Sequence, residues 1–216
     1  MNVIQNGSRI LFQGDSITNC FRRPEEINNA YQLGSGYPLL VASRELASRP
    51  SARLTFLNRG VSGDSLASMA ARWEEDAIAL KPDVVSILIG VGTTLQRFQF
   101  GEPTDDLDAS VAEFAQVYRD VLSKTLKLLP NVRFVICEPF LLVTGTVLAA
   151  MRKDIERRAA MLQRIANDTD AIFVPLQQQF DEAALTTGPE YWAYDGVHPT
   201  AAGHWLIAEA WLKATG

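Results

Sequence analysis

Residues 84–89 of the 216-residue chain have the sequence Val-Val-Ser-Ile-Leu-Ile, an almost unbroken apolar run. Such a run is typical of a β-strand that is buried on both faces, as the strands of parallel sheets are. Pro82 separates it from an amphipathic stretch whose apolar residues recur at helical spacing, namely Leu66, Met69, Trp73, Ala77 and Leu80. The pattern therefore predicts a helix followed by a central strand.

The same alternation continues in both directions along the chain. Shorter apolar runs predict further strands at 10–12, 54–57, 132–137 and 171–174. Helical spacing predicts further helices at 37–46, 107–129, 155–165 and near 205–212. Strands and helices in strict alternation imply crossover connections, which produce an α/β fold with a parallel sheet and helices on both faces.

Composition and charge narrow the possible functions. With 47% hydrophobic and 21% charged residues, the chain is expected to form one globular domain over residues 1–216. The net charge of −5 argues against a nucleic-acid partner. No stretch approaches the roughly 18 apolar residues that cross a membrane. The N-terminal residues lack the features of a signal peptide, so a cytoplasmic location and no membrane partner are expected.

Cysteine and histidine are scarce. The chain has Cys20 and Cys137, and only His198 and His204 as imidazoles. These residues lack the spacing of a disulfide framework or of a zinc site, and no glycine-rich nucleotide motif follows the first strand. We therefore expect no metal and no cofactor, and a catalytic imidazole has to come from one of the two histidines.

The tripeptide Gly14-Asp15-Ser16 lies at the carboxyl end of the first predicted strand. Ligands of open α/β sheets bind at that edge, which makes Ser16 a candidate nucleophile. Helix capping is the alternative, because Asp and Ser are common N-cap residues. The tripeptide recurs at Gly63-Asp64-Ser65, where it opens the amphipathic helix and capping is the better interpretation.

His198 lies in a turn-rich loop, with Asp195 three residues before it. This spacing allows the carboxylate to bind one imidazole nitrogen while the other faces a nucleophile. An ordinary ion pair in a surface loop is the alternative. His204 begins the last helix and is expected to be structural or to lie at the surface.

Four blocks stand in order along the chain. They are residues 10–18 (Ile-Leu-Phe-Gln-Gly-Asp-Ser-Ile-Thr), 58–65 (Asn-Arg-Gly-Val-Ser-Gly-Asp-Ser), 87–94 (Ile-Leu-Ile-Gly-Val-Gly-Thr-Thr) and 195–199 (Asp-Gly-Val-His-Pro). Together they resemble the SGNH (GDSL-type) hydrolase superfamily. The stretches 33–37 and 71–76 look most like its bacterial acetylxylan esterase branch. The resemblance implies a three-layer α/β/α sandwich with a five-stranded parallel sheet, the flavodoxin-like fold of these hydrolases.

The resemblance also implies roles for individual residues. Ser16 would be the nucleophile, His198 the general base and then acid, and Asp195 the carboxylate that orients the imidazole. The backbone N–H groups of Ser16 and Gly63 would bind the oxyanion. The implied enzyme is a serine esterase that removes O-acyl groups, chiefly O-acetyl, from a small-molecule or oligosaccharide ester through an acyl-enzyme. Related esterases often form homo-oligomers.

The third block departs from the family's usual Gly-x-Asn-Asp. Gly92 stands where the asparagine supplies a third oxyanion donor. Loss of one such donor lowers kcat roughly a hundred- to a thousandfold. Thr93, Thr94 or a water molecule are the candidate replacements, and extra room for a bulkier substrate is another interpretation. On this basis an asparagine at position 92 is expected to raise kcat.

Substrate contacts are expected from Asp15 and from aromatic residues whose faces suit sugar rings, namely Tyr37, Phe140, Tyr191 and Trp192. Core packing is the alternative for these aromatic residues. Two other functions stay open beside carbohydrate deacylation. One is a lipase, arylesterase or thioesterase of the same superfamily, and the other is a carbohydrate-binding relative with weakened catalysis.

Overall fold

The computed structural model describes residues 3–24, 30–101 and 103–216. At its centre lies a sheet of five parallel strands in the order β2-β1-β3-β4-β5. The strands are β1 (Arg9–Gly14), β2 (Thr55–Asn58), β3 (Val84–Leu88), β4 (Arg133–Cys137) and β5 (Ile172–Val174). Chain order reverses between β1 and β3, and ligands of such folds bind beside that point, beyond the carboxyl ends of the strands.

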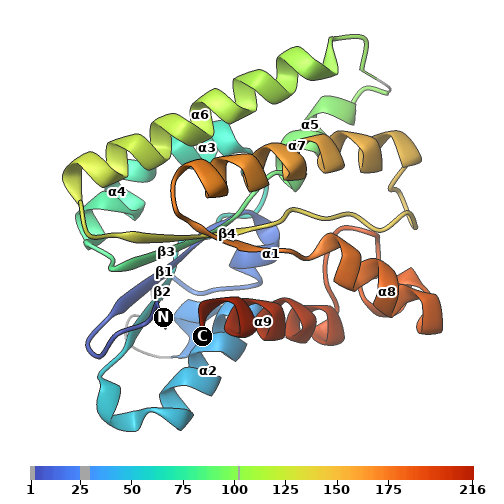
Figure 1. Ribbon diagram of the computed structural model, residues 1–216. Coiled ribbons are helices and arrows are strands. Elements are labelled where there is room, and N and C mark those ends of the chain that lie inside the picture. Colours follow the sequence, from blue (N-terminus) through green and yellow to red (C-terminus); the bar gives the residue numbers. More distant parts are fainter. Residues whose placement is uncertain (1–2, 25–29, 102) are drawn as a thin grey trace.

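Helices cover both faces of the sheet, so the predicted three-layer α/β/α sandwich is confirmed (Figure 1). One layer contains α3 (Leu66–Ala71), α4 (Trp73–Asp76), α6 (Leu107–Leu128) and α7 (Ala149–Asp168). The other contains α2 (Tyr37–Ser48) and α9 (Ala201–Thr215). Three helices directly follow strand ends, namely α1 (Ser16–Asn19), α5 (Val91–Phe98) and α8 (Gln177–Thr187). Single 3-10 turns are η1 (Ala30–Leu33), η2 (Pro50–Ala52), η3 (Ile78–Leu80) and η4 (Pro189–Tyr191).

The central strand β3 contributes to two cores, because successive side chains of a strand point to opposite faces. Val84 and Leu88 belong to the core beneath α2 and α9, whereas Val85 and Ile87 belong to the core beneath α6. Between them, the buried hydroxyl of Ser86 accepts a hydrogen bond of 2.9 Å from the indole of Trp211. The run that predicts the fold is therefore buried on both faces.

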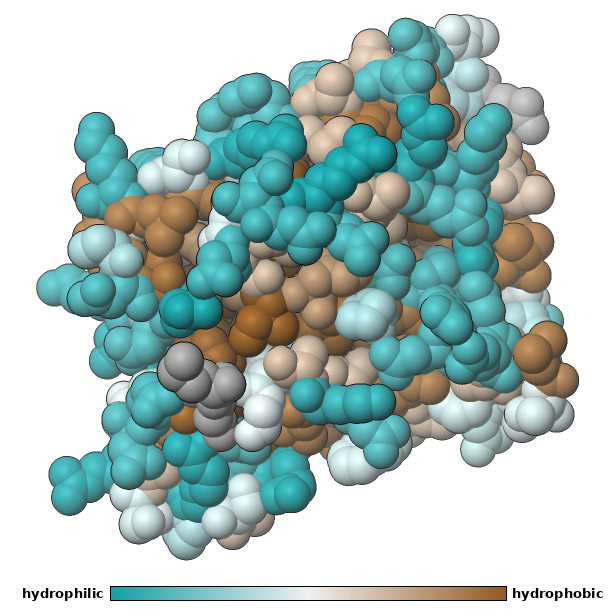
Figure 2. All heavy atoms as spheres, viewed as in Figure 1, coloured by the Kyte–Doolittle hydropathy of each residue, from teal (hydrophilic) through white to brown (hydrophobic). Residues whose placement is uncertain are grey.

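The edge strand β5 has three residues and is partly exposed. In the space-filling view, apolar surface appears between α7 and α9, where this strand lies (Figure 2). Ile172 and Phe173 are half-buried there. In the part of the chain that the structure describes, no helix is both long and apolar enough to span a membrane.

The helix predicted across 66–80 is interrupted. Breaks at Arg72 and Ala77 divide it into α3, α4 and η3. The backbone of Arg72 leaves the helical conformation with φ −101° and ψ 7°, and its side chain bonds to the loop that precedes α3. Met69 and Trp73 are still buried against the sheet, so the apolar face survives in shorter pieces.

Helices α5 and α8 are not predicted by the sequence pattern. The start of α8 depends on a distant side chain, because Glu138 Oε2 accepts hydrogen bonds from the N–H groups of Leu176 and Gln177 at 2.6 and 2.9 Å. A carboxylate in this position satisfies N–H groups that a helix leaves unpaired at its start. Since Glu138 follows β4, the capping signal is absent from the local sequence of α8.

Candidate active site

The backbone is closely packed where the chain leaves β1, and this packing sets the position of Ser16. A Cβ atom added to Gly14 would lie 2.2 Å from the carbonyl oxygen of Leu88 and 2.4 Å from Thr18 Oγ1, so the backbone passes where only glycine fits. The carboxylate of Asp15 then caps α1 by accepting a hydrogen bond of 3.0 Å from the N–H of Ile17. Because Asp15 does the capping, the hydroxyl of Ser16 is available for a different partner.

That partner is His198, on a loop 182 residues further along the chain. Ser16 Oγ lies 2.9 Å from His198 Nε2, and His198 Nδ1 lies 2.7 Å from Asp195 Oδ2. The imidazole thus lies within hydrogen-bonding distance of the hydroxyl on one side and of the carboxylate on the other. In this geometry the imidazole can take the hydroxyl proton while the carboxylate holds the other ring nitrogen.

The loop that carries Asp195 and His198 is fixed by its own backbone. An antiparallel bridge joins Ala193 to Pro199, and Gly196 at φ +85° turns the chain between them. A Cβ atom at Gly196 would lie 2.4 Å from the carbonyl oxygen of Leu142, so this turn also needs glycine. The neighbouring loop is tied to it, since the N–H of Leu142 donates to the Gly196 carbonyl at 2.9 Å.

Asp195 is held as an anion. Burial alone would raise its pKa, but hydrogen bonds from the backbone and ring of His198 and from the N–H of Val197 bring the pKa below its usual range. The two backbone bonds to Oδ1 measure 2.7 Å from His198 and 2.9 Å from Val197. The carboxylate therefore keeps its orientation and its charge while it binds the imidazole.

Asp15 occupies a different environment. Its side chain is 2% exposed, and burial raises the pKa to about 6 against the lowering effects of the Ile17 N–H and of His198. The carboxyl group is enclosed by protein and engaged with the start of α1. This burial corrects the prediction that Asp15 contacts the substrate.

Gly63 lies on the loop between β2 and α3, within a turn closed by a 3.2 Å hydrogen bond from the Asp64 N–H to the Val61 carbonyl. Its φ of +85° suits the glycine position of a type II turn. The loop borders the start of α1, because Val61 donates its N–H to the Gly14 carbonyl at 3.0 Å. A Cβ atom on Gly63 would meet nothing within 4 Å, so this backbone faces open space.

Position 92 has no room for a side chain. A Cβ atom at Gly92 would lie 2.1 Å from the carbonyl oxygen of Asp64. An asparagine would have to displace the turn that carries Gly63 before its amide could act as a donor. This packing argues against the expectation that an asparagine here raises kcat, because the neighbouring turn is packed around glycine.

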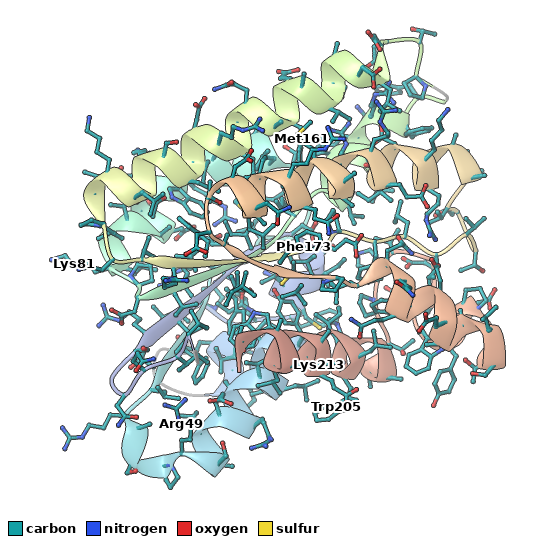
Figure 3. All side chains as sticks on the ribbon, viewed as in Figure 1. Arg49, Lys81, Met161, Phe173, Trp205 and Lys213 are labelled. Carbon is teal, nitrogen blue, oxygen red and sulfur yellow. The ribbon has the colours of Figure 1, made fainter. Side chains whose placement is uncertain are left out.

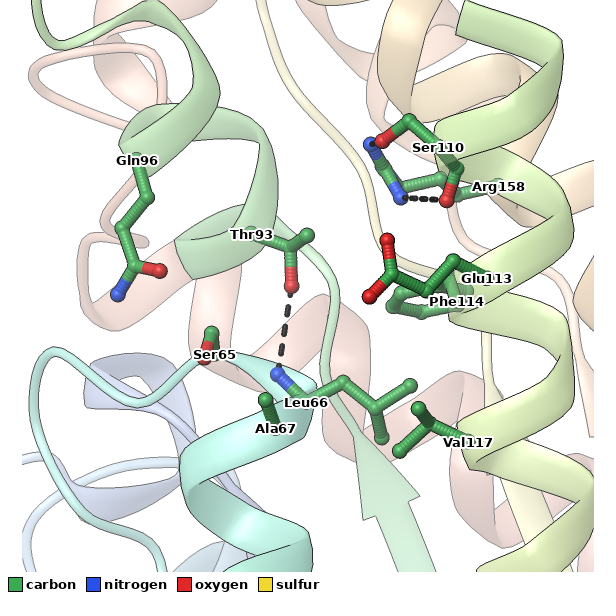
Figure 4. A pocket seen from close by; sticks show the side chains of 10 residues that line it. All are labelled: Ser65, Leu66, Ala67, Thr93, Gln96, Ser110, Glu113, Phe114, Val117 and Arg158. Carbon is green, nitrogen blue, oxygen red and sulfur yellow. Dashed lines mark hydrogen bonds between the residues drawn. The ribbon is translucent and has the colours of Figure 1, made fainter.

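The two threonines after Gly92 hold neighbouring helices. Thr94 Oγ1 donates to Asp154 Oδ1 on α7 at 2.6 Å, and both side chains are buried. Thr93 Oγ1 accepts from the Leu66 N–H at 3.3 Å, at the start of α3 (Figure 4). The Thr94 hydroxyl is thereby committed to α7, and the Thr93 hydroxyl lies against α3 rather than replacing the missing amide.

A pocket of about 170 Å³ lies beside Thr93, between α3, α5, α6 and α7 (Figure 4). It is lined by Ser65, Leu66, Ala67, Thr93, Gln96, Ser110, Glu113, Phe114, Val117 and Arg158. Arg158 is committed to Ser110 and Asp154. None of these lining residues belongs to the Ser16, His198 and Asp195 group, so this pocket is separate from that group.

Two of the aromatic residues predicted to face the substrate are in the core. Tyr37 is fully buried, and its hydroxyl lies 3.0 Å from Thr18 Oγ1. Phe140 is also fully buried and stacks on Phe180 with 3.9 Å between ring centroids. Neither ring is open to a ligand, so the prediction is corrected and their role is packing.

The other two aromatic residues are accessible, at the end of η4. Tyr191 is 56% exposed and meets the half-buried Trp192 edge to face, with 5.3 Å between ring centroids. The Trp192 indole N–H donates to Thr187 Oγ1 at 2.8 Å. Both residues precede the His198 loop, where they stay candidates for substrate contact.

One aromatic residue is missed by the sequence reasoning. The ring of Tyr194 lies nearly parallel to that of His198, with 6.0 Å between centroids and 18° between planes. Tyr194 is 61% exposed. Its position directly before Asp195 is the signal in the sequence, because loops carry many binding residues and Tyr194 belongs to the same loop.

His204 is a buried structural residue. Burial lowers its pKa to about 4, so the ring is neutral. Its Nδ1 accepts the N–H of Tyr37 at 3.2 Å, which leaves the hydrogen on Nε2 to be donated to Cys20 Sγ at 3.3 Å. Of the two histidines, His198 is therefore the one whose imidazole contacts Ser16.

Within residues 3–24, 30–101 and 103–216, no three His, Cys, Asp or Glu side chains gather as metal ligands would.

Comparisons with known proteins agree on the family. The model of the GDSL-like lipase/acylhydrolase family matches residues 12–206. An acetylxylan esterase from Geobacillus stearothermophilus is 35% identical over 99% of this chain and 96% of its own length. Two solved structures cover nearly all of both chains. A GDSL-like protein from Parabacteroides merdae has a TM-score of 0.91 at 34% identity, over 99% of this chain and 97% of its own.

The second structure is Axe2, the acetylxylan esterase from Geobacillus stearothermophilus. Its TM-score is 0.86 at 32% identity, over 100% of this chain and 97% of its own. The match thus includes the strand ends that carry Ser16 and the loop that carries His198. The chain belongs to the GDSL-like lipase/acylhydrolase family and is a carboxylic ester hydrolase.

Proposed function

We propose that this esterase removes O-acyl groups, O-acetyl in particular, from carbohydrates, with Ser16 as nucleophile, His198 as general base and acid, and Asp195 as the partner of the imidazole. The observation that carries the proposal is the line of contacts, 2.9 Å from Ser16 Oγ to His198 Nε2 and 2.7 Å from His198 Nδ1 to Asp195 Oδ2. Similarity to an acetylxylan esterase supports the acetylated carbohydrate as substrate.

Acylation begins when Ser16 Oγ bonds to the ester carbonyl carbon and His198 Nε2 takes the hydroxyl proton. The carbonyl oxygen becomes an oxyanion, and the backbone N–H groups of Ser16 and Gly63 are its donors. When this intermediate collapses, the bond to the sugar oxygen breaks and His198 returns its proton to that oxygen. The sugar leaves as an alcohol, and the acyl group stays on Ser16.

Deacylation reverses these roles with water. His198 takes a proton from a water molecule as the water oxygen attacks the acyl carbon, and it then gives the proton to the departing oxygen of Ser16. The carboxylic acid leaves and the free hydroxyl is restored. Asp195 accepts the hydrogen bond from His198 Nδ1–H during both acylation and deacylation, and it stabilises the imidazolium. Water is the only co-reactant of the two steps.

Substrate contact falls to the accessible aromatic residues before the His198 loop, Tyr191 and Trp192, together with Tyr194. Exposed rings offer broad apolar area with a polar edge, which suits the apolar face and the hydroxyl groups of a sugar. Tyr191 and Tyr194 are more than half exposed. These rings therefore form the proposed carbohydrate-facing surface.

The test measures acetate release from acetylated xylo-oligosaccharides and hydrolysis of 4-nitrophenyl esters with acyl chains of increasing length. Ser16→Ala is expected to lower kcat more than about a thousandfold. Ser48→Ala is the control, because this exposed hydroxyl on α2 donates to the Glu45 carbonyl within its own helix. The acetyl ester is expected to have the highest kcat/KM.

Three results would change the proposal. A preference for long acyl chains would favour a lipase or thioesterase, and activity on aryl esters alone would favour an arylesterase. Equal, slow hydrolysis by the wild type and Ser16→Ala would favour a carbohydrate-binding relative with weakened catalysis. The third result would agree with the absence of an asparagine donor at Gly92, which leaves the oxyanion with two proposed donors.

A further inference from the structure

Arg72 lies at the break between α3 and α4, and its side chain turns back beneath the loop that carries Gly63. The side chain is 20% exposed. Its Nε and Nη2 lie 2.8 and 2.6 Å from Asp64 Oδ2, and its Nη1 donates to the Arg59 carbonyl at 2.8 Å. One guanidinium therefore holds the beginning and the end of the loop from Arg59 to Asp64.

The same guanidinium connects the loop to the elements beneath it. Nη1 also donates to Asp76 Oδ2 on α4 at 2.7 Å and to Gln13 Oε1 on β1 at 3.2 Å. Gln13 is fully buried and, in turn, donates its amide to the Asp76 carbonyl at 2.8 Å. Since Gln13 lies on the strand that leads to Ser16, Arg72 links the nucleophile's strand to the Gly63 loop.

The loop is confined from its other side by α5. The carbonyl oxygen of Asp64 packs where a side chain at position 92 would stand, 2.1 Å from the Cβ position of Gly92. Gln96 Nε2, one turn further along α5, donates to the Gly63 carbonyl at 3.4 Å. Asp64 is thus held between Arg72 on one side and α5 on the other, with Gly63 directly before it.

We infer that Arg72 is a positioning residue that holds the Gly63 N–H in place to bind the oxyanion, by clamping Asp64 and Arg59 at the two ends of the loop. The inference rests on the proposed function. It also assigns a role to the close packing at Gly92. Where the family's third donor is missing, Arg72 and the packing of the Asp64 carbonyl hold the loop that presents the Gly63 N–H.

The clamp acts on the transition state rather than on substrate binding. A carbonyl oxygen carries its full negative charge only in the tetrahedral intermediate, so a displaced donor lowers kcat and leaves KM nearly unchanged. The planar guanidinium reaches Asp64, Arg59 and Asp76 at once through a fixed fork of donors. A lysine ammonium keeps the charge but lacks that fork, so it is expected to replace Arg72 poorly.

The experiment compares Arg72→Lys, Arg72→Ala, Asp64→Asn and the Arg72→Ala/Asp64→Asn pair on 4-nitrophenyl acetate. Arg72→Lys is expected to lower kcat about 10- to 100-fold with KM changed less than about threefold. Asp64→Asn is expected to lower kcat less, because the Arg59 contact survives. The double variant is expected to match Arg72→Ala, since both changes remove the same clamp.

Binding of phenylboronic acid supplies a readout that general destabilisation does not move. A boronic acid adds to a serine hydroxyl as a tetrahedral anion, whose oxygen occupies the oxyanion position. Its inhibition constant is expected to rise by about the factor by which kcat falls in each Arg72 and Asp64 variant. If Arg72→Ala does not fold, Arg72→Lys and Asp64→Asn carry the same test.

Arg49 is the matched control (Figure 3). It is 27% exposed, pairs with Glu45 at 3.2 Å and donates to the backbone carbonyl of Ile4, so it too joins a carboxylate to a neighbouring segment. It follows α2, away from the loops that hold Ser16 and His198 (Figure 3). Arg49→Ala and Arg49→Lys are expected to change stability while kcat and boronate binding stay at the wild-type level.

The outcomes separate the clamp from the proposed function. If the wild type hydrolyses the ester no faster than Ser16→Ala, the proposed function fails and the clamp fails with it. If hydrolysis depends on Ser16 but the folded Arg72 variants keep wild-type kcat and boronate binding, as the Arg49 variants do, the clamp alone is overturned. Parallel loss of kcat and of boronate affinity supports it.

Discussion

The ring of Tyr194 lies nearly parallel to the imidazole of His198, with 6.0 Å between centroids and 18° between planes. We expect this stacking to limit how far the imidazole can rotate away from Ser16. Tyr194→Ala is expected to lower kcat/KM about two- to tenfold, the range of an aromatic pair, whereas Tyr194→Phe keeps the ring and most of the activity. The measurement is kcat/KM on 4-nitrophenyl acetate.

A larger loss on acetylated xylo-oligosaccharides than on the aryl ester would add a sugar-binding role for Tyr194. Trp205→Ala is the control, since this 48% exposed ring lies on α9, outside the loop that carries Asp195 and His198 (Figure 3). Wild-type kinetics in Tyr194→Ala would show that the stacking has no influence on His198.

Substitutions of Gly92 are expected to lower both stability and kcat. A Cβ atom 2.1 Å from the Asp64 carbonyl oxygen forces the backbone apart, and overpacking of this kind typically costs about 1–3 kcal/mol. Urea unfolding and steady-state kinetics of Gly92→Ala and Gly92→Asn provide the measurement. A higher kcat in Gly92→Asn than in the wild type would revive the missing amide as the main defect of the site.

The two Gly-Asp-Ser copies are expected to respond in opposite ways. Ser65 caps α3, where its hydroxyl and that of Ser68 form a capping box, so Ser65→Ala is expected to destabilise the fold by about 1 kcal/mol. It leaves Ser16, the proposed nucleophile, in place and is therefore expected to keep most of the activity. Ser16→Ala is expected to abolish hydrolysis with little change in unfolding free energy. A stability loss confined to Ser16→Ala would reverse the two assignments.

Asp15 and His204 give opposite pH dependence to the stability. The pKa of Asp15 rises from 3.8 to about 6 on folding, so its contribution is present at low pH and is lost as the pH rises from about 4 through 6. The pKa of His204 falls from 6.5 to about 4, so its contribution is present above pH 6.5 and is lost as the pH falls through 4. Each shift corresponds to about 3 kcal/mol, and in the wild type the two largely cancel.

Single variants are expected to expose each contribution. In Asp15→Asn, the unfolding free energy should fall by about 3 kcal/mol more than in the wild type between pH 6.5 and pH 4. In His204→Gln, it should rise over the same interval. Urea titrations at the two pH values measure both, and identical slopes in all three proteins would contradict the assignment.

The strands and the loops that carry Ser16 and His198 were predictable because their signals lie in the local sequence. A strand buried on both faces needs an apolar run, and residues 84–89 supply one. Ser16 and His198 follow short motifs whose spacing is set by the turns themselves. Gly14 and Gly196 show why, since close backbone contacts at both positions admit only glycine.

Other features depend on contacts that leave no local signal. Phe140 is buried because it stacks on Phe180 of α8, a helix whose start is capped from a distance by Glu138. Gly92 suggests a lost donor from sequence alone, whereas the structure fills the space with the Asp64 carbonyl. The single domain, the cytoplasmic location and the homo-oligomer stay predictions.

The 182-residue separation between Ser16 and His198 has a consequence for the growing polypeptide. Translation produces Ser16, the proposed nucleophile, well before Asp195 and His198. During translation, a chain that stops before Asp195 carries a serine with no imidazole beside it. Under the proposed mechanism, acyl-ester turnover therefore requires a chain synthesised beyond His198, by which point all five strands have been made.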